Sequence, residues 1–416
     1  MSVLDDQQIP KPLTTRIINA TVIVAALGYF VDIYDLILFG IVRTPSLMDF
    51  GYSGDALVDK GVFLINIQMA GMLIGGILWG IWGDKRGRLS VLFGSIAMYS
   101  VANIANAFVP NIPLYAVCRF IAGIGLAGEL GAGITLVNES MTKEHRGWGT
   151  MVVVTFGALG AVVAALIADN FSWHTSYIVG GCLGLVLLIT RIGLFESGMF
   201  SKFKESNRGM ELRALFSDRK RVIKYIHCIV IGLPVWYVVG ILVVFSPELA
   251  TKVLHVDGDI KAGIAILWCY VGLSVGDFLS GTLSQLFKSR KKIIVLYLIM
   301  CSVSIFAYLF TRNISPFMFY TFCFVLGTTT GFWALFVTMA SEQFGTNIRS
   351  TVTTTVPNFV RGVVIPLTYS FKVLADRYDL LTSACIVGVV TMALSFYSIT
   401  RLKDTYGKDL DYIEMS

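Results

Sequence analysis

Residues 80–88 have the sequence Gly80-Ile81-Trp82-Gly83-Asp84-Lys85-Arg86-Gly87-Arg88. Two long apolar segments flank this stretch, at roughly residues 62–82 and 89–109. Each segment has about the 20 residues that an α-helix needs to cross the hydrocarbon core of a bilayer. The stretch is therefore predicted to be a tight, cationic turn between two membrane helices, whose glycines allow helix backbones to approach closely.

The composition supports a membrane protein and argues against several other classes. Of the 416 residues, 55% are hydrophobic and 14% are charged, whereas a soluble domain has about 25% charged residues. The net charge of +6 is spread over short loops rather than one basic face, so no nucleic-acid partner is expected. The seven cysteines stand singly and the four histidines are dispersed. We therefore expect no metal, no cofactor and no enzymatic activity.

Twelve apolar runs are long enough to span a membrane. They predict an all-α membrane protein with twelve transmembrane helices in two pseudo-symmetric, six-helix halves. The expected spans are residues 16–43, 60–83, 89–109, 112–138, 148–169, 173–195, 222–249, 259–287, 292–311, 316–341, 350–375 and 380–401. The predicted domains are an N-terminal tail (1–15), an N-terminal bundle (16–195), a linker (196–221), a C-terminal bundle (222–401) and a C-terminal tail (402–416).

The distribution of positive charge indicates the orientation. Most of the 33 Lys and Arg residues lie at the N-terminus, in alternate loops beginning with the 80–88 turn, and in the C-terminal tail. Cytoplasmic loops of membrane proteins carry this excess. Both termini are therefore predicted to be cytoplasmic, in a multi-pass protein of the plasma membrane (the inner membrane of a bacterium) that works as a monomer.

The two halves of the chain are predicted to be repeats. Asn138-Glu139 is followed by Arg146-Gly147, and Ser341-Glu342 is followed at the same interval by Arg349-Ser350. Repeats of this kind place a substrate cavity between the halves at the bilayer midplane. Charged residues of the loops between helices are predicted to act as gates at the cytoplasmic side. They are Asp84, Arg88, Glu139, Arg146, Glu342 and Arg349.

Ionisable side chains inside the predicted spans are functional candidates, because each costs several kcal/mol in hydrocarbon. Asp32 and Asp35 are three residues apart and share one helix face. Asp35 matches Arg119 in depth, so an ion pair is expected, either static or opened by protonation. Glu129 has no evident cation at its depth, and Arg191 is close enough to a span end to reach water. Asp32, Asp35 and Glu129 are the candidate proton-coupling residues.

Arg361 lies near the middle of the helix expected over residues 350–375, between two prolines that loosen that helix. Its planar guanidinium suits a carboxylate or phosphate ligand, and the alternative is a partner role for Asp32 or Glu129. Polar and aromatic side chains near the same level are candidates for the cavity wall. The predicted substrate-binding residues are Tyr34, Arg119, Trp236, Tyr237, Trp268, Asn358 and Arg361, with Tyr270, Phe332 and Trp333 as further aromatic candidates.

Two motifs carry a resemblance to a known family. Gly28-x-x-x-Asp32-x-Tyr34-Asp35-x-x-x-Phe39-Gly40 resembles helix 1 of the metabolite:proton symporters, a branch of the major facilitator superfamily that usually has Glu in place of Asp32. Arg119-x-x-x-Gly123-x-Gly125-x-x-Gly128-Glu129-x-Gly131 resembles helix 4 of the same branch, a pattern that sugar porters partly share. The resemblance implies the facilitator fold and metabolites such as citrate-like acids, shikimate, proline or betaine. The expected helix 5 lacks the Gly-Pro pair of drug exporters, which favours import.

The sequence thus predicts a secondary transporter that imports a small anionic or zwitterionic metabolite together with protons, by alternating access. Its expected partners are this small-molecule substrate and the lipid bilayer. The alternatives are a carrier of a neutral solute such as a sugar, an exporter, and a non-transporting membrane receptor. The buried charges argue against a sugar, and the intact turn with Asp84 and Arg88 argues against a receptor, because a static receptor needs no gate.

Overall fold

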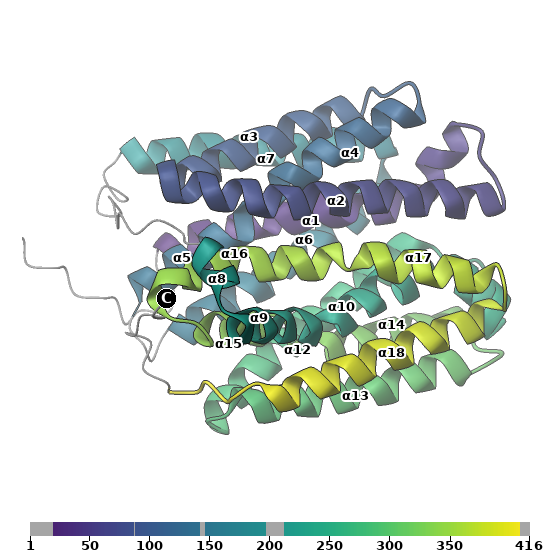
Figure 1. Cartoon of the computed structure of the whole chain (residues 1–416). Helices are drawn as coiled ribbons and strands as arrows, with labels where there is room; N and C mark the ends of the chain where they lie inside the picture. The colour runs from purple at the N-terminus through teal and green to yellow at the C-terminus, as the bar shows by residue number, and fades with distance from the viewer. Residues whose placement is uncertain (1–19, 87, 142–145, 197–211, 408–416) are drawn as a thin grey trace, which may run out of the picture.

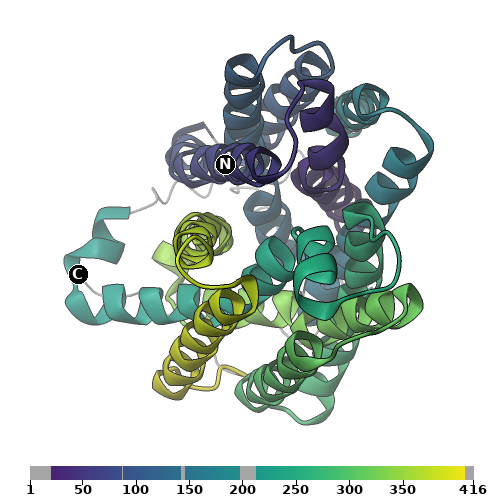
Figure 2. The same ribbon diagram turned by 90° about the vertical axis from the view of Figure 1, so that its right-hand side faces the viewer.

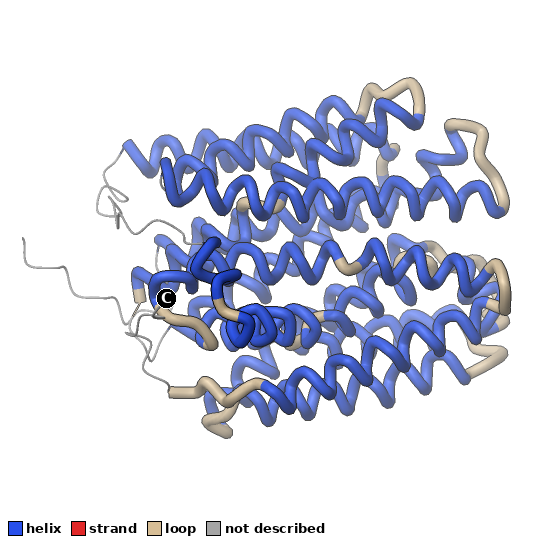
Figure 3. The backbone as a smooth tube through the Cα atoms, in the orientation of Figure 1, coloured by secondary structure: helices blue, strands red, loops and turns tan. Residues whose placement is uncertain are grey.

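The computed structural model describes residues 20–86, 88–141, 146–196 and 212–407. These residues form a bundle of long helices whose axes run in roughly one direction, and no strand occurs among them (Figures 1 and 3). The helices fall into two groups, which occupy the upper and lower parts of Figure 1 and are seen end-on in Figure 2. The end of the bundle at residues 86–88 is called the predicted cytoplasmic end below, and the opposite end is the predicted outer end.

Among the described residues, the first half contains seven helices. They are α1 (Ala20–Asp49), α2 (Asp55–Arg86), α3 (Arg88–Asn106), α4 (Ile112–Leu126), α5 (Glu129–Ser140), α6 (Arg146–Asn170) and α7 (Trp173–Glu196). The short helix α8 (Leu212–Ser217) follows at the predicted cytoplasmic end, where it packs against α9 and α16 of the second half (Figure 1).

The second half contains more helical segments because several of its spans are interrupted. They are α9 (Arg219–Ile231), α10 (Leu233–Tyr237), the π-helix η1 (Val238–Val243), α11 (Ser246–Leu249), the π-helix η2 (Ala250–Leu254), α12 (Ala262–Leu286), α13 (Arg290–Phe310), α14 (Pro316–Thr330), α15 (Trp333–Glu342), α16 (Thr346–Gly362), α17 (Val364–Ala375) and α18 (Leu380–Arg401).

The prediction of an all-α membrane fold with twelve spans is confirmed. Ten helical stretches of the described residues are long and apolar enough to cross a membrane. The other two expected spans are occupied by α3 and by the pair α16–α17. The pair α16–α17 is less apolar because α16 is rich in threonine and carries Arg361.

Several spans that were expected to be continuous are broken near their middle. The breaks fall at residues 127–128, Gly232, residues 331–332 and Val363. Pro234 follows the second break and Pro366 follows the fourth, at positions where the proline ring opposes the helical bonding of the preceding turn. Broken helices free backbone groups at the level where transporters bind their ligands.

Glycines at matching positions allow close helix packing within each of the two halves. A Cβ atom added to Gly71 or Gly75 of α2 would meet backbone atoms of α4, and one added to Gly272 or Gly276 of α12 would meet backbone atoms of α14. Helix backbones that approach so closely leave no space for a side chain. The same packing device therefore occurs at equivalent places in the two halves, as expected for internal repeats.

The two halves meet along two helix pairs. Helix α6 packs along α12, and α2 packs along α16 and α17. The side chains that face the seam between these pairs form the candidate site.

Candidate functional site

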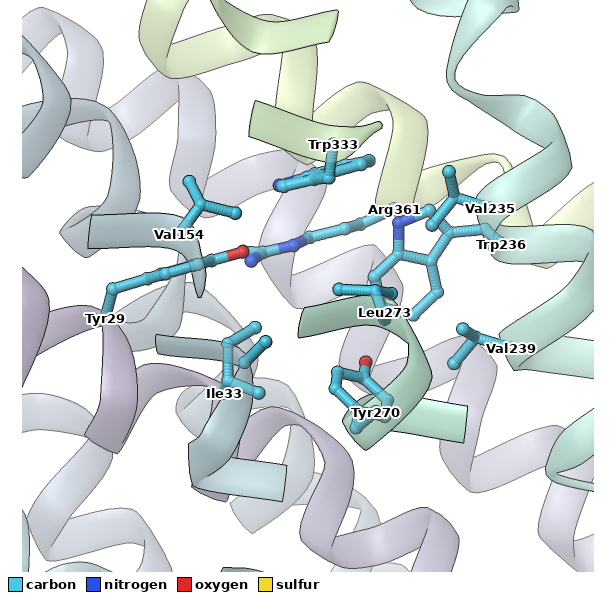
Figure 4. A pocket seen from close by; sticks show the side chains of 11 residues that line it. Tyr29, Ile33, Val154, Val235, Trp236, Val239, Tyr270, Leu273, Trp333 and Arg361 are labelled. Atoms are coloured by element: carbon cyan, nitrogen blue, oxygen red, sulfur yellow. The ribbon is translucent and has the colours of Figure 1, made fainter. Parts of the chain in front are cut away.

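A small cavity lies between the two halves, and helices of both contribute to its wall (Figure 4). Its interior offers about 20 Å³ to the centres of water-sized molecules, which is about enough for one water molecule. A ring-sized ligand would therefore need the halves to move apart. The lining residues are Tyr29, Ile33, Val154, Ala158, Val235, Trp236, Val239, Tyr270, Leu273, Trp333 and Arg361.

Arg361 is the charged residue of this wall, and it forms an ion pair across the two halves. Its Nη2 atom lies 3.3 Å from Oδ2 of Asp32 on α1. Both side chains are buried, at 1% and 0% exposure. The Nε and Nη1 groups of Arg361 and the Oδ1 atom of Asp32 have no hydrogen-bond partner among the described residues. The pair is thus only partly satisfied, and the guanidinium keeps free donors at the cavity.

Helix breaks place the two tryptophans of the wall. Trp236 lies in α10, the short helix that begins after Gly232, and Trp333 is the first residue of α15. Asp277 of α12 accepts a hydrogen bond of 3.0 Å from the backbone N–H of Ala334, at the start of α15. A carboxylate at a helix N-terminus is favourable because it faces unpaired N–H groups and the positive end of the helix dipole. Asp277 therefore holds the helix start that presents Trp333 to the cavity.

The expected ion pair between Asp35 and Arg119 is not formed in this structure, so the prediction of a static pair was wrong. Arg119 instead donates to the side chain of Asn103. With the Asn106 amide turned so that its oxygen faces the guanidinium, this oxygen accepts a hydrogen bond of 2.7 Å from Arg119 Nε. The guanidinium carbon of Arg119 also lies 4.7 Å from the ring centre of Tyr177, a favourable cation–π distance. Neither oxygen of Asp35 has a hydrogen-bond partner within the described ranges.

Glu129 does have a cation, contrary to the prediction. Arg191 of α7 donates to both oxygens of Glu129, with Nη1 at 3.1 Å from Oε2, and also to the backbone carbonyl of Val24 at 3.2 Å. The side chains are 4% and 1% exposed, so Arg191 does not reach water at a span end either. A paired, buried carboxylate is a structural element as well as a candidate proton carrier.

Replacing Glu129 with Gln is expected to lower the melting temperature of the purified protein more than the double change Glu129→Gln with Arg191→Gln. The single change leaves Arg191 buried without its counter-charge, which costs about 3–5 kcal/mol for a buried pair. The double change removes both charges. Thermal unfolding in detergent measures the difference. Wild-type stability of the single variant, together with loss of proton-driven accumulation, would instead support the predicted proton-coupling role.

The other predicted substrate-binding residues lie away from the cavity wall. The Tyr34 hydroxyl donates to the carbonyl of Ser176 at 2.9 Å, and the Tyr237 hydroxyl donates to that of Ala384 at 2.7 Å, so both pack within their own half. Trp268 is 42% exposed on the surface of α12, with its ring centre 6.4 Å from that of Phe324. Of the seven predicted contacts, Trp236 and Arg361 line the cavity.

Three aromatic residues of the wall, Tyr29, Tyr270 and Trp333, were not among the seven. Tyr29 and Tyr270 lie on α1 and α12, and the Tyr29 hydroxyl lies toward Arg361 in the cavity (Figure 4). Tyr29 precedes Asp32 by three residues, so a search of the helix face that carries Asp32 would have found it. Tyr270 and Trp333 had been singled out only as further aromatic candidates.

The comparisons with known proteins decide the family. The family model of the Major Facilitator Superfamily matches residues 25–368. The chain belongs to this superfamily. The resemblance seen in helices 1 and 4 is thereby confirmed, and the protein is a facilitator-type membrane transporter.

Relatives and a solved structure agree with this assignment. The putative niacin/nicotinamide transporter NiaP of Bacillus subtilis is 26% identical over 83% of this chain and 86% of its own length. The niacin transporter NiaP of Acinetobacter baylyi is 32% identical over 38% of this chain and only 36% of its own length. The proton:xylose symporter XylE superposes with a TM-score of 0.70 at 16% identity, covering 94% of this chain and 97% of the other. The last likeness shows the shared fold.

The facilitator halves are also joined on the predicted cytoplasmic side of the cavity. The amide of Asn358, one turn before Arg361 in α16, donates to the carbonyl of Ala127 at 2.8 Å, at the break between α4 and α5. This predicted substrate contact is thus a hydrogen bond between the halves.

Two of the predicted gating residues have partners within the second half. Glu342 accepts two hydrogen bonds from Arg290, at 2.6 and 2.8 Å, and Arg349 donates to the carbonyl of Phe344. Arg290 is therefore a partner at this end that the sequence did not single out.

The remaining predicted gating residues are Asp84, Arg88, Glu139 and Arg146. Their side chains lie outside the part of the chain that the structure describes at side-chain level, so their gating role stays a prediction.

Ion pairs join the facilitator halves at the predicted outer end, and the sequence did not indicate them. Arg43 of α1 is buried and lies 2.8 Å from Glu248 of α11, with its guanidinium carbon 4.6 Å from the ring centre of Phe245. Around it, lysines of the second half meet aspartates of the first. These pairs are Lys252–Asp55, Lys261–Asp169 and Lys372–Asp59, at 3.9, 2.8 and 2.6 Å. Exposed pairs of this kind are each worth little, and the Arg43 pair differs from them in that its guanidinium is buried.

Proposed function

We propose that this facilitator imports small aromatic monocarboxylates together with protons. The observation that carries the proposal is the Arg361 guanidinium, whose Nε and Nη1 atoms have no hydrogen-bond partner among the described residues, in a cavity walled by four aromatic rings. The rings belong to Tyr29, Trp236, Tyr270 and Trp333.

The chemistry of this wall favours an aromatic anion. A guanidinium binds a carboxylate through two parallel hydrogen bonds, which are among the strongest available to a side chain. Aromatic side chains stack on a flat ring or meet its edge. The name of the Acinetobacter relative supports this class, because niacin is an aromatic ring with one carboxylate, and the name of the Bacillus relative includes both niacin and its neutral amide. A neutral sugar has no group that needs Arg361.

Proton coupling is proposed to work through Asp32. A proton on Asp32 removes its charge and releases Arg361, whose guanidinium then takes the substrate carboxylate in place of Asp32. When proton and substrate have left toward the cytoplasm, the Asp32–Arg361 pair forms again and ties α1 to α16. This exchange explains why the pair is only partly satisfied and why it crosses the two halves, which rock against each other in transporters built from repeats.

The proposed cycle has a definite charge balance. One proton and one monocarboxylate carry no net charge, so the pH gradient alone would drive uptake with this stoichiometry. A second proton, for which Asp35 is the candidate, would add one positive charge and about 2.3 kcal/mol of driving force per 100 mV of membrane potential. Both termini are proposed to lie in the cytoplasm, with the protein in the inner membrane.

Uptake into proteoliposomes tests the proposal. With an inward proton gradient of one pH unit and no membrane potential, nicotinate is expected to accumulate up to about tenfold, because one pH unit corresponds to about 1.4 kcal/mol. Nicotinamide has the same ring with a neutral amide and should not accumulate. Protein-free liposomes are the essential control, because protonated aromatic acids cross bilayers unaided. Uptake of xylose, or nicotinate uptake indifferent to the proton gradient, would contradict the proposal.

A further inference from the structure

Two tryptophans of the cavity wall carry indole N–H groups that are not paired. Trp236 and Trp333 are buried, and Nε1 of neither has a hydrogen-bond partner among the residues that the structure describes. Their ring centres are 6.5 Å apart, with an angle of 74° between the planes. The indole nitrogen is a donor only, and a buried donor left unpaired costs free energy. Two such donors in one cavity favour a ligand that brings acceptors.

The positions of both indoles are set by the backbone. Each tryptophan follows a helix break, and α15, which begins with Trp333, is held at its start by the Asp277 carboxylate. The rings also meet edge to face, which is a favourable aromatic geometry. The N–H groups are therefore presented by fixed elements rather than by a mobile loop, as a selective site requires.

The polar groups of the wall are unbalanced in favour of donors. Arg361 offers free Nε and Nη1 groups, and the two tryptophans add one N–H each. The hydroxyls of Tyr29 and Tyr270 can either donate or accept. A carboxylate bound to Arg361 would accept two parallel hydrogen bonds from one edge of the guanidinium through its two oxygens. The indole N–H groups then remain for an acceptor elsewhere on the ligand.

We propose that Trp236 and Trp333 determine substrate specificity, and that the substrate is an aromatic carboxylate whose ring carries a second hydrogen-bond acceptor. A pyridine nitrogen or a ring-bound oxygen has the required chemistry. This inference rests on the proposed function, because it takes Arg361 as the group that binds the carboxylate. The inference adds that the protein recognises the substrate ring by hydrogen bonds as well as by stacking.

Binding of two matched acids tests the inference. Nicotinate and benzoate have the same shape and the same carboxylate, but only nicotinate has a nitrogen acceptor in its ring. Isothermal titration of the purified wild-type protein is expected to show nicotinate binding about tenfold more tightly, the effect of one hydrogen bond to an otherwise unpaired donor. We expect one of the two indole N–H groups to donate to the ring nitrogen of nicotinate. Replacing that tryptophan, by Trp236→Phe or Trp333→Phe, should make the protein bind the two acids equally. Its affinity for benzoate should fall less than its affinity for nicotinate, because phenylalanine keeps an aromatic ring.

Trp268→Phe is the matched control, because this tryptophan lies on the exposed surface of α12 and should leave the ratio unchanged. If the wild type binds neither acid, the proposed function fails. If it binds both acids equally, the carboxylate site stands and the role of the indoles is wrong. An equal loss of affinity for both acids in the two phenylalanine variants would also contradict the proposed role of the indoles, since it would show that they serve packing. The wild-type ratio decides even if a variant does not fold.

Discussion

Replacing Arg361 with Gln is expected to weaken nicotinate binding about 10- to 100-fold. Hydrogen bonds to a charged partner contribute about 1.5–3 kcal/mol, and each 1.4 kcal/mol is a factor of ten in affinity. The change removes both the charge and the fork that holds a carboxylate. Calorimetry or quenching of tryptophan fluorescence on the purified protein measures the effect. Arg361→Lys should recover part of the affinity, because it keeps the charge but not the planar fork.

The control for folding is the double change Asp32→Asn with Arg361→Gln. Arg361→Gln alone leaves Asp32 buried at the centre of the protein without its partner, which is destabilising in itself. The double variant removes both charges and should regain thermal stability while still failing to bind nicotinate. Binding at wild-type strength in this double variant would exclude Arg361 as the carboxylate contact.

Replacing Asp32 with Asn is expected to abolish proton-driven accumulation while leaving exchange of substrate across the membrane. Asparagine cannot take up a proton, so the release of Arg361 no longer depends on pH. Arg361 is then permanently free of its carboxylate partner and continues to bind substrate. In proteoliposomes, accumulation at a gradient of one pH unit should fall from up to about tenfold to none. Counterflow with internal unlabelled nicotinate should persist.

Asp35→Asn separates the two candidate carboxylates of helix 1. Asp35 lies within the first half beside Gly180 of α7, and it forms no ion pair with Arg119. Its replacement should keep proton-driven accumulation, and change at most the response to membrane potential. If Asp35→Asn abolishes accumulation and Asp32→Asn does not, the coupling residue is Asp35, and the proposed exchange at Arg361 is wrong.

Neighbouring aromatic residues show how far hydropathy can predict which side chains line the cavity. Trp268 and Tyr270 lie at nearly the same depth on α12, but two residues correspond to about 200° of rotation around a helix. Tyr270 therefore lines the cavity, and Trp268 is exposed on the outside. Trp236 and Tyr237 differ in the same way, since Tyr237 is bonded to α18. Hydropathy gives the depth of such residues well, but in a helix that is apolar all round it does not give their direction.

The ion pairs show the same limit for charges. Depth suggested that Asp35 should meet Arg119 and that Glu129 should be alone. In the structure, Arg119 donates hydrogen bonds to asparagines of α3, and Glu129 forms an ion pair with Arg191 of α7. Arg191 is 62 residues from Glu129, whereas Asn103 is 16 residues from Arg119, in the preceding helix. For Arg361 the sequence left open a ligand role and a partner role for Asp32 or Glu129, and in the structure it pairs with Asp32. The cost of a cation in hydrocarbon marks such a residue from sequence alone.

By itself, the sequence determined the all-helical membrane fold, its twelve spans and its two related halves, and it singled out Asp32 and Arg361 as candidates. These properties follow from the hydropathy and spacing of residues along one segment at a time. Only the tertiary structure decided that Asp32 pairs with Arg361, that Arg43 pairs with Glu248, and that Trp236 and Trp333 share one cavity. The physical reason is that such contacts depend on how each helix is rotated, and on where it breaks, when it packs against segments from the other half of the chain.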